Sequence, residues 1–278
     1  MNAASSSGNG HFKAVTVNYR SREDVLRLAD NLFTQCGCAE LVVVNHDPSE
    51  NLEGLSRKYP VRVVSQKNKG YGAGLNRGLR EIREWDGMVL LCNPDVSVAS
   101  LKTMSSALQY MRSNPDVACV LPVLTGRDGK VRKSFRQFYT MTTLVGSRLF
   151  KRDQAPAFMH RHFYMDRDSS RPMEVDWGCG AVMLVRGPIF AGTVSFDERF
   201  FLYFEDVDIC AQIWRAGLKV VWHPHFQCSH GEGAESRRKI RFLKWHVVSA
   251  LRFVMKYRGF PTRETLMRRR RMAASPAT

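Results

Sequence analysis

The chain has 278 residues, of which 44% are hydrophobic and 24% are charged, so it is long enough and apolar enough to bury one large globular core. Its seven cysteines are scattered without the spacing of a disulfide framework or a zinc site, which favours a reducing cytoplasm. The first residues are small and polar, and no run approaches the roughly 18 apolar residues that cross a bilayer, so we expect neither a signal peptide nor a membrane span.

The net charge of +16 is concentrated at the carboxyl-terminal end of the chain. Residues 236–278 contain 13 Lys or Arg and a single acid, Glu264, so about 12 of the excess positive charges lie there. This asymmetry predicts an anionic partner for that segment.

Apolar runs that predict strands alternate with helix-like stretches in the first half of the chain. The predicted strands are 12–17, 40–44, 61–65, 88–92 and 117–123, and the predicted helices are 22–33, 73–85 and 98–112. The alternation predicts an α/β fold in which helices cover both faces of a mostly parallel central sheet.

The pattern changes after residue 125. Residues 126–129 predict a hairpin turn, and 140–171 has no clear period and is expected to form a mobile loop or lid. The remaining predictions are a strand at 175–185 that two glycines interrupt, a helix at 205–216 and a strand at 219–222.

The segment 88–96 joins a buried strand to a single carboxylate. The apolar run 88–92 leads directly into Asn93, Pro94 and Asp95, and Pro94 makes this turn stiff because its ring fixes the backbone. Ligands of open α/β sheets bind beyond the carboxyl ends of the strands, so Asp95 is placed to meet a phosphate-bound divalent cation. An ordinary strand-end turn would use the same residue types.

A glycine-rich segment, 68–78, leads into a predicted helix. Glycines let a backbone approach a ligand closely, and a helix amino terminus attracts anions. The segment matches neither the P-loop nor the dinucleotide-binding fingerprint, and a plain strand-to-helix loop is the alternative.

Three carboxylates, Glu205, Asp206 and Asp208, follow an aromatic run at the start of a predicted helix. One acid would satisfy helix capping. At about 100° per residue, Glu205 and Asp208 share a face of the helix while Asp206 points elsewhere. One side of the cluster can therefore have a structural role while the other faces a cleft. Aromatic neighbours would raise the pKa of a carboxylate by desolvation, as a general base requires. Farther along, His230 ends an apolar element, where a metal or phosphate contact is expected.

Together these segments resemble the family 2 glycosyltransferases, which have the A-type (GT-A, Rossmann-like) nucleotide-sugar-binding fold. The turn 93–95 resembles their variant of the Asp-x-Asp metal motif, and 196–208 resembles their acceptor-side motif with its catalytic Glu–Asp pair. The loop 177–181 resembles the loop that faces the acceptor, and 68–78 resembles the donor segment. The resemblance covers about four-fifths of the chain and extends to the bacterial dTDP-rhamnosyltransferases.

The resemblance implies one GT-A domain at 12–233, with a donor-binding half at 12–125 and an acceptor half at 126–233. A disordered tail at 1–11 and a basic amphipathic helical tail at 234–278 would flank it. The site residues that follow from the resemblance are Asp206 and Glu205 for catalysis; Asn18, Tyr19, Asn45, Asn68, Gly70, Gly72, Asn76, Asn93 and Asp95 for the donor; Trp177, Gly180 and Asp208 for the acceptor; and Asp95 with His230 for a metal.

The implied reaction is inverting transfer of L-rhamnose from dTDP-L-rhamnose to a saccharide or lipid-diphosphate-linked acceptor in bacterial surface polysaccharide synthesis. Asp95 and His230 would hold Mg²⁺ or Mn²⁺ at the donor diphosphate, and Asp206 would take the proton of the acceptor hydroxyl. Glu205 or Asp208 would hold the acceptor or the start of the helix.

Two further expectations concern recognition of the substrates. Trp177 would offer a flat apolar surface to a sugar ring. The second strand of the family usually ends in an Asp–Asn pair, whereas here Asn45 and His46 follow the strand and the nearest acid is Asp47. Recognition of the base is therefore altered or shifted, and a UDP-sugar donor stays open.

The basic segment 237–271 predicts an amphipathic helix. Its apolar stripe consists of Ile240, Leu243, Val247, Leu251 and Val254, widened by Phe242, Trp245 and Phe253. Lys and Arg around such a stripe are typical of a helix that lies on anionic lipid, so we expect a peripheral position on the inner face of the cytoplasmic membrane. A helix that packs on the core with a solvated basic face is the alternative.

Three other classes remain as rivals. A nucleotidyltransferase would use similar metal chemistry but would usually need a basic nucleotide-gripping motif near its start, which is missing. A polyanion-binding protein fits the charge, but there is no helix-turn-helix, zinc-finger or RNP-like pattern, so no specific nucleic acid is expected. The third is an inactive transferase in which Asn45 breaks one motif.

Overall fold

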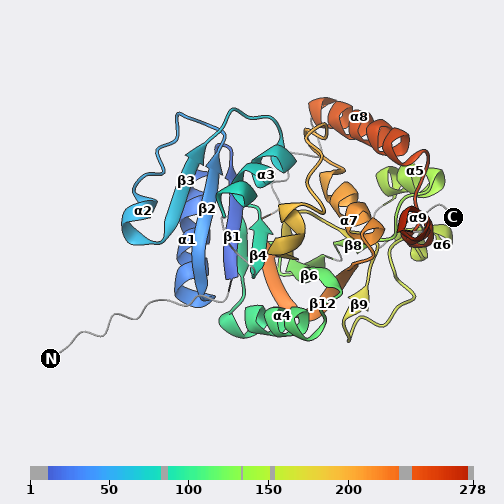
Figure 1. Cartoon of the computed structure of the whole chain (residues 1–278), viewed down its shortest axis with the longest axis horizontal. Coiled ribbons are helices and arrows are strands. Elements are labelled where there is room, and N and C mark those ends of the chain that lie inside the picture. The colour runs from blue at the N-terminus through green and yellow to red at the C-terminus, as the bar shows by residue number, and fades with distance from the viewer. Residues whose placement is uncertain (1–11, 83–86, 133, 151–153, 232–239, 275–278) are drawn as a thin grey trace.

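The computed structural model describes residues 12–82, 87–132, 134–150, 154–231 and 240–274 (Figure 1). Its first half alternates strands and helices. These are β1 (Phe12–Asn18), α1 (Arg22–Gln35), β2 (Cys38–Asn45), α2 (Leu55–Lys58), β3 (Val61–Ser65), α3 (Tyr71–Glu81), β4 (Met88–Cys92), β5 (Val96–Val98), α4 (Leu101–Ser113) and β6 (Val117–Thr125).

The second half contains shorter strands and most of the remaining helices. These are β7 (Val131–Arg132), β8 (Phe135–Arg136), α5 (Met141–Leu149), α6 (Ala157–His160), β9 (Met173–Glu174), β10 (Trp177–Gly178), β11 (Val182–Arg186), a 3-10 helix (Gly187–Ala191), α7 (Glu205–Arg215), β12 (Lys219–His230), α8 (Ile240–Tyr257) and α9 (Arg263–Ala274).

The main sheet has the strand order β3-β2-β1-β4-β11-β6-β12-β5, with β7 and β9 at its margins. Strands β3, β2, β1 and β4 are parallel, as are β6 and β12. Strand β11 runs antiparallel between β4 and β6, and β5 runs antiparallel to β12. The predicted α/β fold is confirmed, with a central sheet that is mixed and mostly parallel.

Side chains of β1 alternate between two cores, because successive residues of a strand point to opposite faces. Val15 and Val17 belong to the core that includes residues of α3 and α7. Phe12 and Ala14 belong to the core that includes residues of α1 and α4. The sheet is thus covered on both faces, and its loops at the carboxyl ends of the parallel strands are left to form a site.

The predicted loop or lid at 140–171 is wrong, since helices α5 and α6 lie within it. Thr140 starts α5 with a capping box: Thr143 N donates to Thr140 Oγ1 at 3.2 Å, and Thr140 N donates to Thr143 Oγ1 at 2.8 Å. The usual residue at the third position of a capping box is Glu or Gln, so the pair of threonines does not match the sequence pattern that predicts a helix start. In addition, Met141, Val145 and Leu149 on α5 are exposed, so its apolar period does not mark a core-facing side.

The predicted strand 219–222 is too short, because β12 continues to His230. Its register with β6 shifts between Trp222 and Gln227, and Pro224 lies within that irregularity. A proline cannot donate to a strand ladder and is tolerated at a bulge, so the strand continues beyond Pro224 with a shifted register. The predicted helix at 98–112 also starts late, at Leu101, since Val96–Val98 forms β5.

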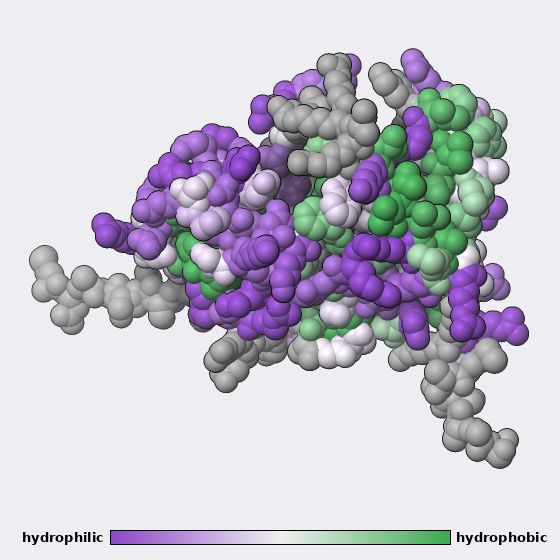
Figure 2. Space-filling view, turned by 90° about the horizontal axis from the view of Figure 1, so that it is seen from above, coloured by the Kyte–Doolittle hydropathy of each residue, from purple (hydrophilic) through white to green (hydrophobic). Residues whose placement is uncertain are grey.

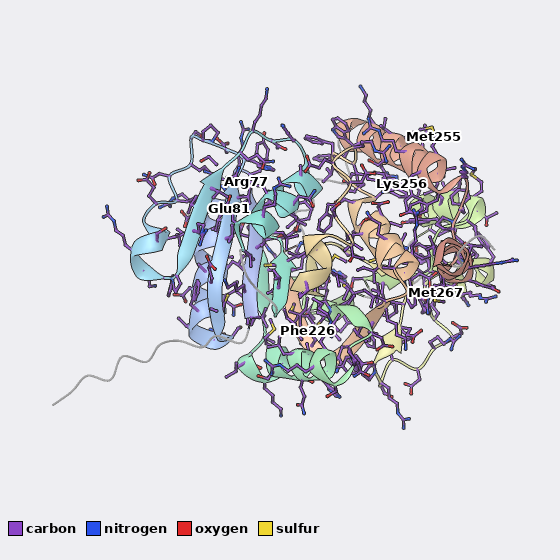
Figure 3. The ribbon with its side chains drawn as sticks, in the orientation of Figure 1. Arg77, Glu81, Phe226, Met255, Lys256 and Met267 are labelled. Carbon is purple, nitrogen blue, oxygen red and sulfur yellow. The ribbon has the colours of Figure 1, made fainter. Side chains whose placement is uncertain are left out.

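The carboxyl-terminal segment forms two helices instead of the single one predicted, and residues 237–239 lie outside the described part of the chain. Arg258 and Gly259, with φ of +55° and +124°, separate α8 from α9. Helix α8 packs on the domain through one side, which buries Ser249, Phe253 and Tyr257. Figure 3 shows Lys256 on the side of α8 that faces α7 and Met255 on the outer side. Among the helices of the described residues, none is long and apolar enough to cross a membrane.

Candidate active site

Asparagines brace the carboxyl edge of the parallel strands. Asn18 at the end of β1 is in register with Asn45 at the end of β2. Asn18 Nδ2 donates to Asn45 Oδ1 at 2.9 Å and to Glu50 Oε2 at 2.7 Å, and Asn45 Nδ2 donates to the Glu50 carbonyl at 3.1 Å. Both asparagines are buried, so their amides hold the edge together. Tyr19, the next residue, remains about half exposed.

The acid that follows this edge most closely in the sequence is Asp47. The Ser49 hydroxyl and backbone N–H donate to Asp47 Oδ1 at 2.6 and 3.1 Å, and Arg20 pairs with Oδ2 at 3.1 Å. These hydrogen bonds, with that of the Ser49 side chain first, lower the pKa of Asp47. The edge therefore carries an ionised carboxylate two residues beyond the position where the family usually has its aspartate.

The glycine-rich segment turns sharply against the aromatic run that precedes α7. Gly70 has a φ of +112°, and a Cβ at this position would lie 2.5 Å from the Phe201 carbonyl oxygen. Asn68 Oδ1 accepts from Gly70 N at 3.0 Å, and Tyr71 N donates to the Phe201 carbonyl at 3.1 Å. Only glycine fits such a backbone contact, so this segment and the acid cluster are built as one unit.

Asn76 lies inside α3 and fastens the same unit. Its Nδ2 donates to the Phe196 carbonyl at 2.8 Å and to Glu198 Oε1 at 3.1 Å, while its Oδ1 accepts from Phe196 N at 3.0 Å. All of its amide groups are engaged within the protein. Asn76 was expected to contact the donor, and its geometry instead supports a positioning role. The next residue, Arg77, pairs at 2.8 Å with Glu81, which lies one turn farther along α3 (Figure 3).

Asp95 and His230 are brought together by the pairing of β5 with β12, in which Val96 is in register with His230. His230 Nε2 lies 3.3 Å from Asp95 Oδ1 and 3.2 Å from Asn93 Nδ2. Gly231 N donates to the Asp95 carbonyl at 2.9 Å, which closes the turn. Asn93 and Asp95, which are neighbours in the sequence, thus meet His230 from the far end of the chain beside the end of β4.

Helix α7 begins in an unusual backbone conformation. Tyr203 and Phe204, which precede it, both have a φ of +67°. Left-handed backbone at two successive non-glycine residues is costly and is found where surrounding structure holds a functional segment in place. The two residues that follow are Glu205 and Asp206.

The two carboxylates have different surroundings. Asp206 Oδ2 accepts from Gly180 N at 3.1 Å and Oδ1 accepts from Val207 N at 2.9 Å. Burial raises the pKa of Asp206, and these hydrogen bonds counteract part of that rise. Glu205 is buried with no partner for Oε2 among the described residues, and burial together with the charge of Asp206 raises its pKa well above the usual range. Asp206 therefore ionises more readily, while Glu205 favours its neutral form.

A single short loop connects the acid cluster to the metal-motif turn. The Gly180 N–H donates to Asp206, and the carbonyl of the next residue, Ala181, accepts from Asn93 N at 2.9 Å. The Tyr71 hydroxyl donates to the Gly180 carbonyl at 3.3 Å. The candidate base, the glycine-rich segment and the turn that carries Asp95 thus meet at two adjacent residues.

Asp208 was expected to contact the acceptor, but the structure gives it another place. It is fully buried, and its carboxylate accepts from Lys256 at 2.7 and 2.8 Å, from Tyr257 at 2.9 Å and from Gln212 at 2.7 Å. Burial raises the pKa of Asp208, and Lys256 opposes that rise. With its oxygens occupied and no exposed surface, Asp208 anchors α8 to α7.

Trp177 was expected to stack on a sugar, but it is buried. Its ring lies 5.4 Å from that of Tyr139, its Nε1 donates to the Gln137 carbonyl at 2.9 Å, and Arg136 lies over the ring at 5.3 Å. Arg136 is the residue that sequence reasoning missed: its positive charge is one of the influences that lower the pKa of Asp206. It lies on the two-residue strand β8, which pairs with β10, and no local motif marks it.

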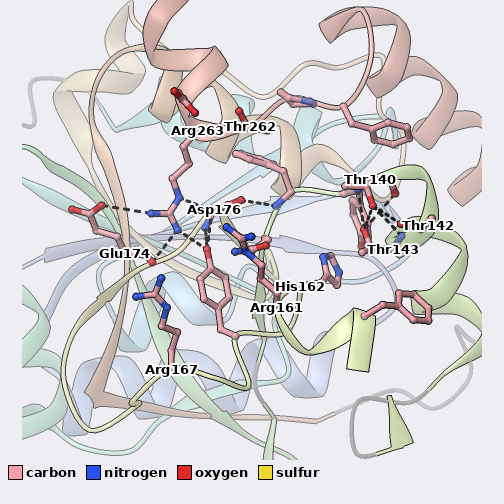
Figure 4. A pocket seen from close by; sticks show the side chains of 18 of the residues that line it. Thr140, Thr142, Thr143, Arg161, His162, Arg167, Glu174, Asp176, Thr262 and Arg263 are labelled. Carbon is pink, nitrogen blue, oxygen red and sulfur yellow. Dashed lines mark hydrogen bonds and ion pairs between the residues drawn. The ribbon is translucent and has the colours of Figure 1, made fainter. Parts of the chain in front are cut away.

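A cavity of about 870 Å³ lies beside this arrangement, among α5, α6 and the start of α9 (Figure 4). Arg263 spans one wall, where it pairs with Asp176 and donates to the Glu174 carbonyl at 3.0 Å. Arg161 and Arg167 line another part of the cavity. Tyr139 connects the cavity to the acid cluster, since it lines the wall and its ring lies 5.5 Å from that of Phe204.

Comparison with known proteins decides the family. The family model described as glycosyl transferase family 2 matches residues 14–185, which is more than half of the chain. The chain belongs to glycosyltransferase family 2. This confirms the resemblance drawn from the metal-motif turn and the acid cluster.

Curated relatives of this glycosyltransferase include two rhamnosyltransferases. The N-acetylglucosaminyl-diphospho-decaprenol L-rhamnosyltransferase of Mycobacterium tuberculosis is 27% identical over 224 residues, which cover 75% of this chain and 71% of the relative. The rhamnosyltransferase WbbL of Escherichia coli is 22% identical over 252 residues, which cover 88% of this chain and 92% of the relative.

Solved structures support the GT-A fold. The mannosyltransferase PcManGT of Pyrobaculum calidifontis, in complex with GDP-Man and Mn²⁺, has a TM-score of 0.61 at 14% identity and covers 95% of this chain and 70% of its own. GalNAc-T7 with UDP, GalNAc and Mn²⁺ also has a TM-score of 0.61 at 14% identity; the match covers 81% of this chain but only 43% of that one.

The residues of the metal-motif turn fit a divalent cation. Ligands at about 2.1 Å from an octahedral ion are roughly 3 Å apart, close to the 3.3 Å between Asp95 Oδ1 and His230 Nε2. The Asn93 amide N–H faces His230 Nε2 at 3.2 Å, so this nitrogen can be an acceptor, and a metal would take its lone pair in place of the hydrogen bond. The described residues contain no group of three or more His, Cys, Asp or Glu that could hold a metal, so the donor phosphates and water would complete the shell.

Proposed function

We propose that this glycosyltransferase transfers a sugar, with inversion, from a nucleoside diphosphate donor to an acceptor hydroxyl. The observation that carries the proposal is the loop at Gly180 and Ala181, which hydrogen-bonds to the candidate base on one side and to the metal-motif turn on the other. Such a loop keeps a proton acceptor and a phosphate site at a constant separation, which is what attack opposite a departing diphosphate requires.

In this mechanism Asp206 removes the proton of the acceptor hydroxyl while the oxygen attacks the anomeric carbon. The bond from that carbon to the diphosphate breaks, and the nucleoside diphosphate leaves with the electron pair. Each Asp206 oxygen accepts one backbone hydrogen bond and retains a lone pair for the acceptor. Glu205, neutral because of its raised pKa, would donate a hydrogen bond to a substrate oxygen.

The donor site would lie between Asp95 and the glycine-rich segment. A Mg²⁺ or Mn²⁺ ion bound to Asp95 and His230 would offset the negative charge of the diphosphate. Gly70 and Gly72 would bring the backbone close to the donor, with Asn68 holding the bend. Tyr19 and the edge at Asn45 would face the nucleotide, and Asp47 would replace the missing strand-end aspartate.

We further propose dTDP-L-rhamnose as the donor and a lipid-diphosphate-linked saccharide as the acceptor, in synthesis of a bacterial surface polysaccharide. The names of the mycobacterial and Escherichia coli relatives support this choice. The altered edge at Asn45 favours one alternative, a UDP-sugar donor. With either donor, a lipid-linked acceptor would place the enzyme at the inner face of the cytoplasmic membrane, with its carboxyl-terminal helices near the lipid.

The test is a transfer assay with dTDP-L-rhamnose and a panel of UDP-sugars, each with and without Mn²⁺. We expect Asp206→Asn to lower kcat on the order of 10²- to 10⁴-fold, because the general base is lost. Asp30→Asn, on the exposed side of α1, is the matched control and should leave kcat unchanged. Binding of the nucleoside diphosphate, followed by thermal shift, should persist in both variants. Near-normal turnover by Asp206→Asn would contradict the assignment of the base.

A further inference from the structure

Helices α5 and α8 each expose a regular apolar stripe. On α8 the stripe consists of Leu243, Val247, Leu251 and Met255, and on α5 it consists of Met141, Val145 and Leu149. Residues four apart lie on the same face of a helix, and these seven side chains are between 49% and 71% exposed. Single exposed apolar residues are normal, whereas two such stripes on neighbouring helices are typical of an interaction surface.

The two stripes belong to one face of the molecule. Arg148 on α5 lies close enough to α8 that its charge, after burial, contributes to lowering the pKa of His246 to about 4. Phe150 at the end of α5 and Phe158 on α6 extend the apolar surface with rings 6.3 Å apart. Figure 2 shows hydrophobic side chains gathered over the part of the molecule that holds these helices.

The charged residues of the three helices on this face are all basic. Helices α5, α6 and α8 contain no Asp or Glu. Arg148 and Lys244 are exposed among the apolar side chains, and Arg161 follows directly after α6 at the rim of the cavity. Apolar stripes on helices whose own charged residues are all basic complement the anionic head groups and acyl chains of a bilayer.

The opposite side of α8 is fastened to the segment that leads into the acid cluster. Trp245 stacks on Phe201 with ring centroids 4.6 Å apart, and Ser249 Oγ donates to the Leu202 carbonyl at 2.9 Å. His246 packs against Phe204 at 5.3 Å, one residue before Glu205. The exposed stripe is therefore about one helix diameter, roughly 10 Å, from the backbone that carries the candidate base.

We propose that α5 and α8 together form a face that docks on an anionic lipid bilayer. The role of this docking rests on the proposed function. An acceptor whose lipid stays in the bilayer would present its sugar beside α7. Docking requires both helices, which distinguishes this face from a basic tail that binds lipid alone. A second copy of the chain on the same face is the competing occupant.

The test is cosedimentation of the full chain with vesicles of phosphatidylcholine alone or with phosphatidylglycerol. We expect binding only to the anionic vesicles, and weaker binding at high salt because screening shortens the reach of the charges. Val145→Glu on α5 and Leu251→Glu on α8 should each weaken binding about ten-fold or more, since each places an acid in the apolar contact. Leu101→Glu, at an exposed apolar site on α4, is the matched control and should bind like the parent chain.

Three outcomes would overturn the proposal: equal binding to both kinds of vesicle, loss of binding in Leu251→Glu but not in Val145→Glu, or a dimer in sedimentation that Leu251→Glu dissolves without any vesicle binding. Each variant is also tested for thermal stabilisation by a nucleoside diphosphate with Mn²⁺. Vesicle binding without that stabilisation would support the docking face and contradict the proposed sugar transfer. Stabilisation without vesicle binding would support the proposed transfer and contradict the docking face.

Discussion

Replacing Lys256 by methionine tests how α8 is held on the domain. The fully buried Asp208 carboxylate faces Lys256 Nζ at 2.7 and 2.8 Å, and Lys256 also reaches Asp197 at 2.9 Å. Lys256→Met keeps the length of the side chain and removes its charge. It leaves Asp208 buried with only the neutral donors Tyr257 and Gln212.

The expected loss follows from this geometry. Removing one partner of a buried ion pair costs about 3–5 kcal/mol, and the two neutral donors that remain place the value near 3 kcal/mol. For a protein of this size that corresponds to a fall in Tm of about 6–12 °C. Without Lys256 the pKa of Asp208 rises further, so its folded-state pKa lies above the unfolded value. The loss should therefore be smallest near pH 4, where Asp208 is protonated in the folded state and about half protonated in the unfolded state, and should grow as the pH rises.

The assay is thermal unfolding of the parent chain and variants between pH 4 and pH 8. Lys244→Met, on the exposed side of the same helix, is the matched control and should unfold like the parent. The double variant Asp208→Asn with Lys256→Met should recover part of the loss, because no charge is then left buried. The reasoning is refuted if Lys256→Met unfolds within about 2 °C of the parent, or if the double variant is no more stable than the single one.

Four further predictions concern the site. The kcat of the parent enzyme should fall as the pH drops through the raised pKa of Asp206, so an acid limb at or below pH 3.9, the ordinary value, would contradict the role of burial. Because the folded-state pKa of Glu205 is raised, Glu205→Gln should raise Tm at neutral and alkaline pH with no gain below about pH 4, and a gain independent of pH would count against it. His230→Ala should weaken Mn²⁺ binding in the presence of nucleoside diphosphate by about ten-fold or more in calorimetry, and unchanged affinity would remove it from the metal site. Gly70→Ala should destabilise the fold by about 1–3 kcal/mol through its positive φ and the contact with Phe201, as measured by urea unfolding, and a neutral result would mean that the bend can relax.

Local sequence determined the framework of the donor half. The predicted strands 61–65 and 88–92 coincide with β3 and β4, because buried parallel strands are short apolar runs with clear turn residues at their ends. The turn at Asn93 and Asp95 was also predicted from the sequence, because Pro94 fixes its own backbone and restricts that of Asn93.

Tertiary structure decided the roles of the remaining side chains. His230 meets Asp95 because β12 continues beyond Pro224 and pairs with β5. The spacing of the acids placed Glu205 and Asp208 on one face of α7, but whether such a face meets a cleft or Lys256 depends on where α8 packs. Arg136 had no motif at all, and it influences Asp206 through the pairing of two short strands. The local sequence determines which backbone conformations have low free energy. The burial and the partners that set the pKa of a carboxylate come from segments that are far apart in the chain.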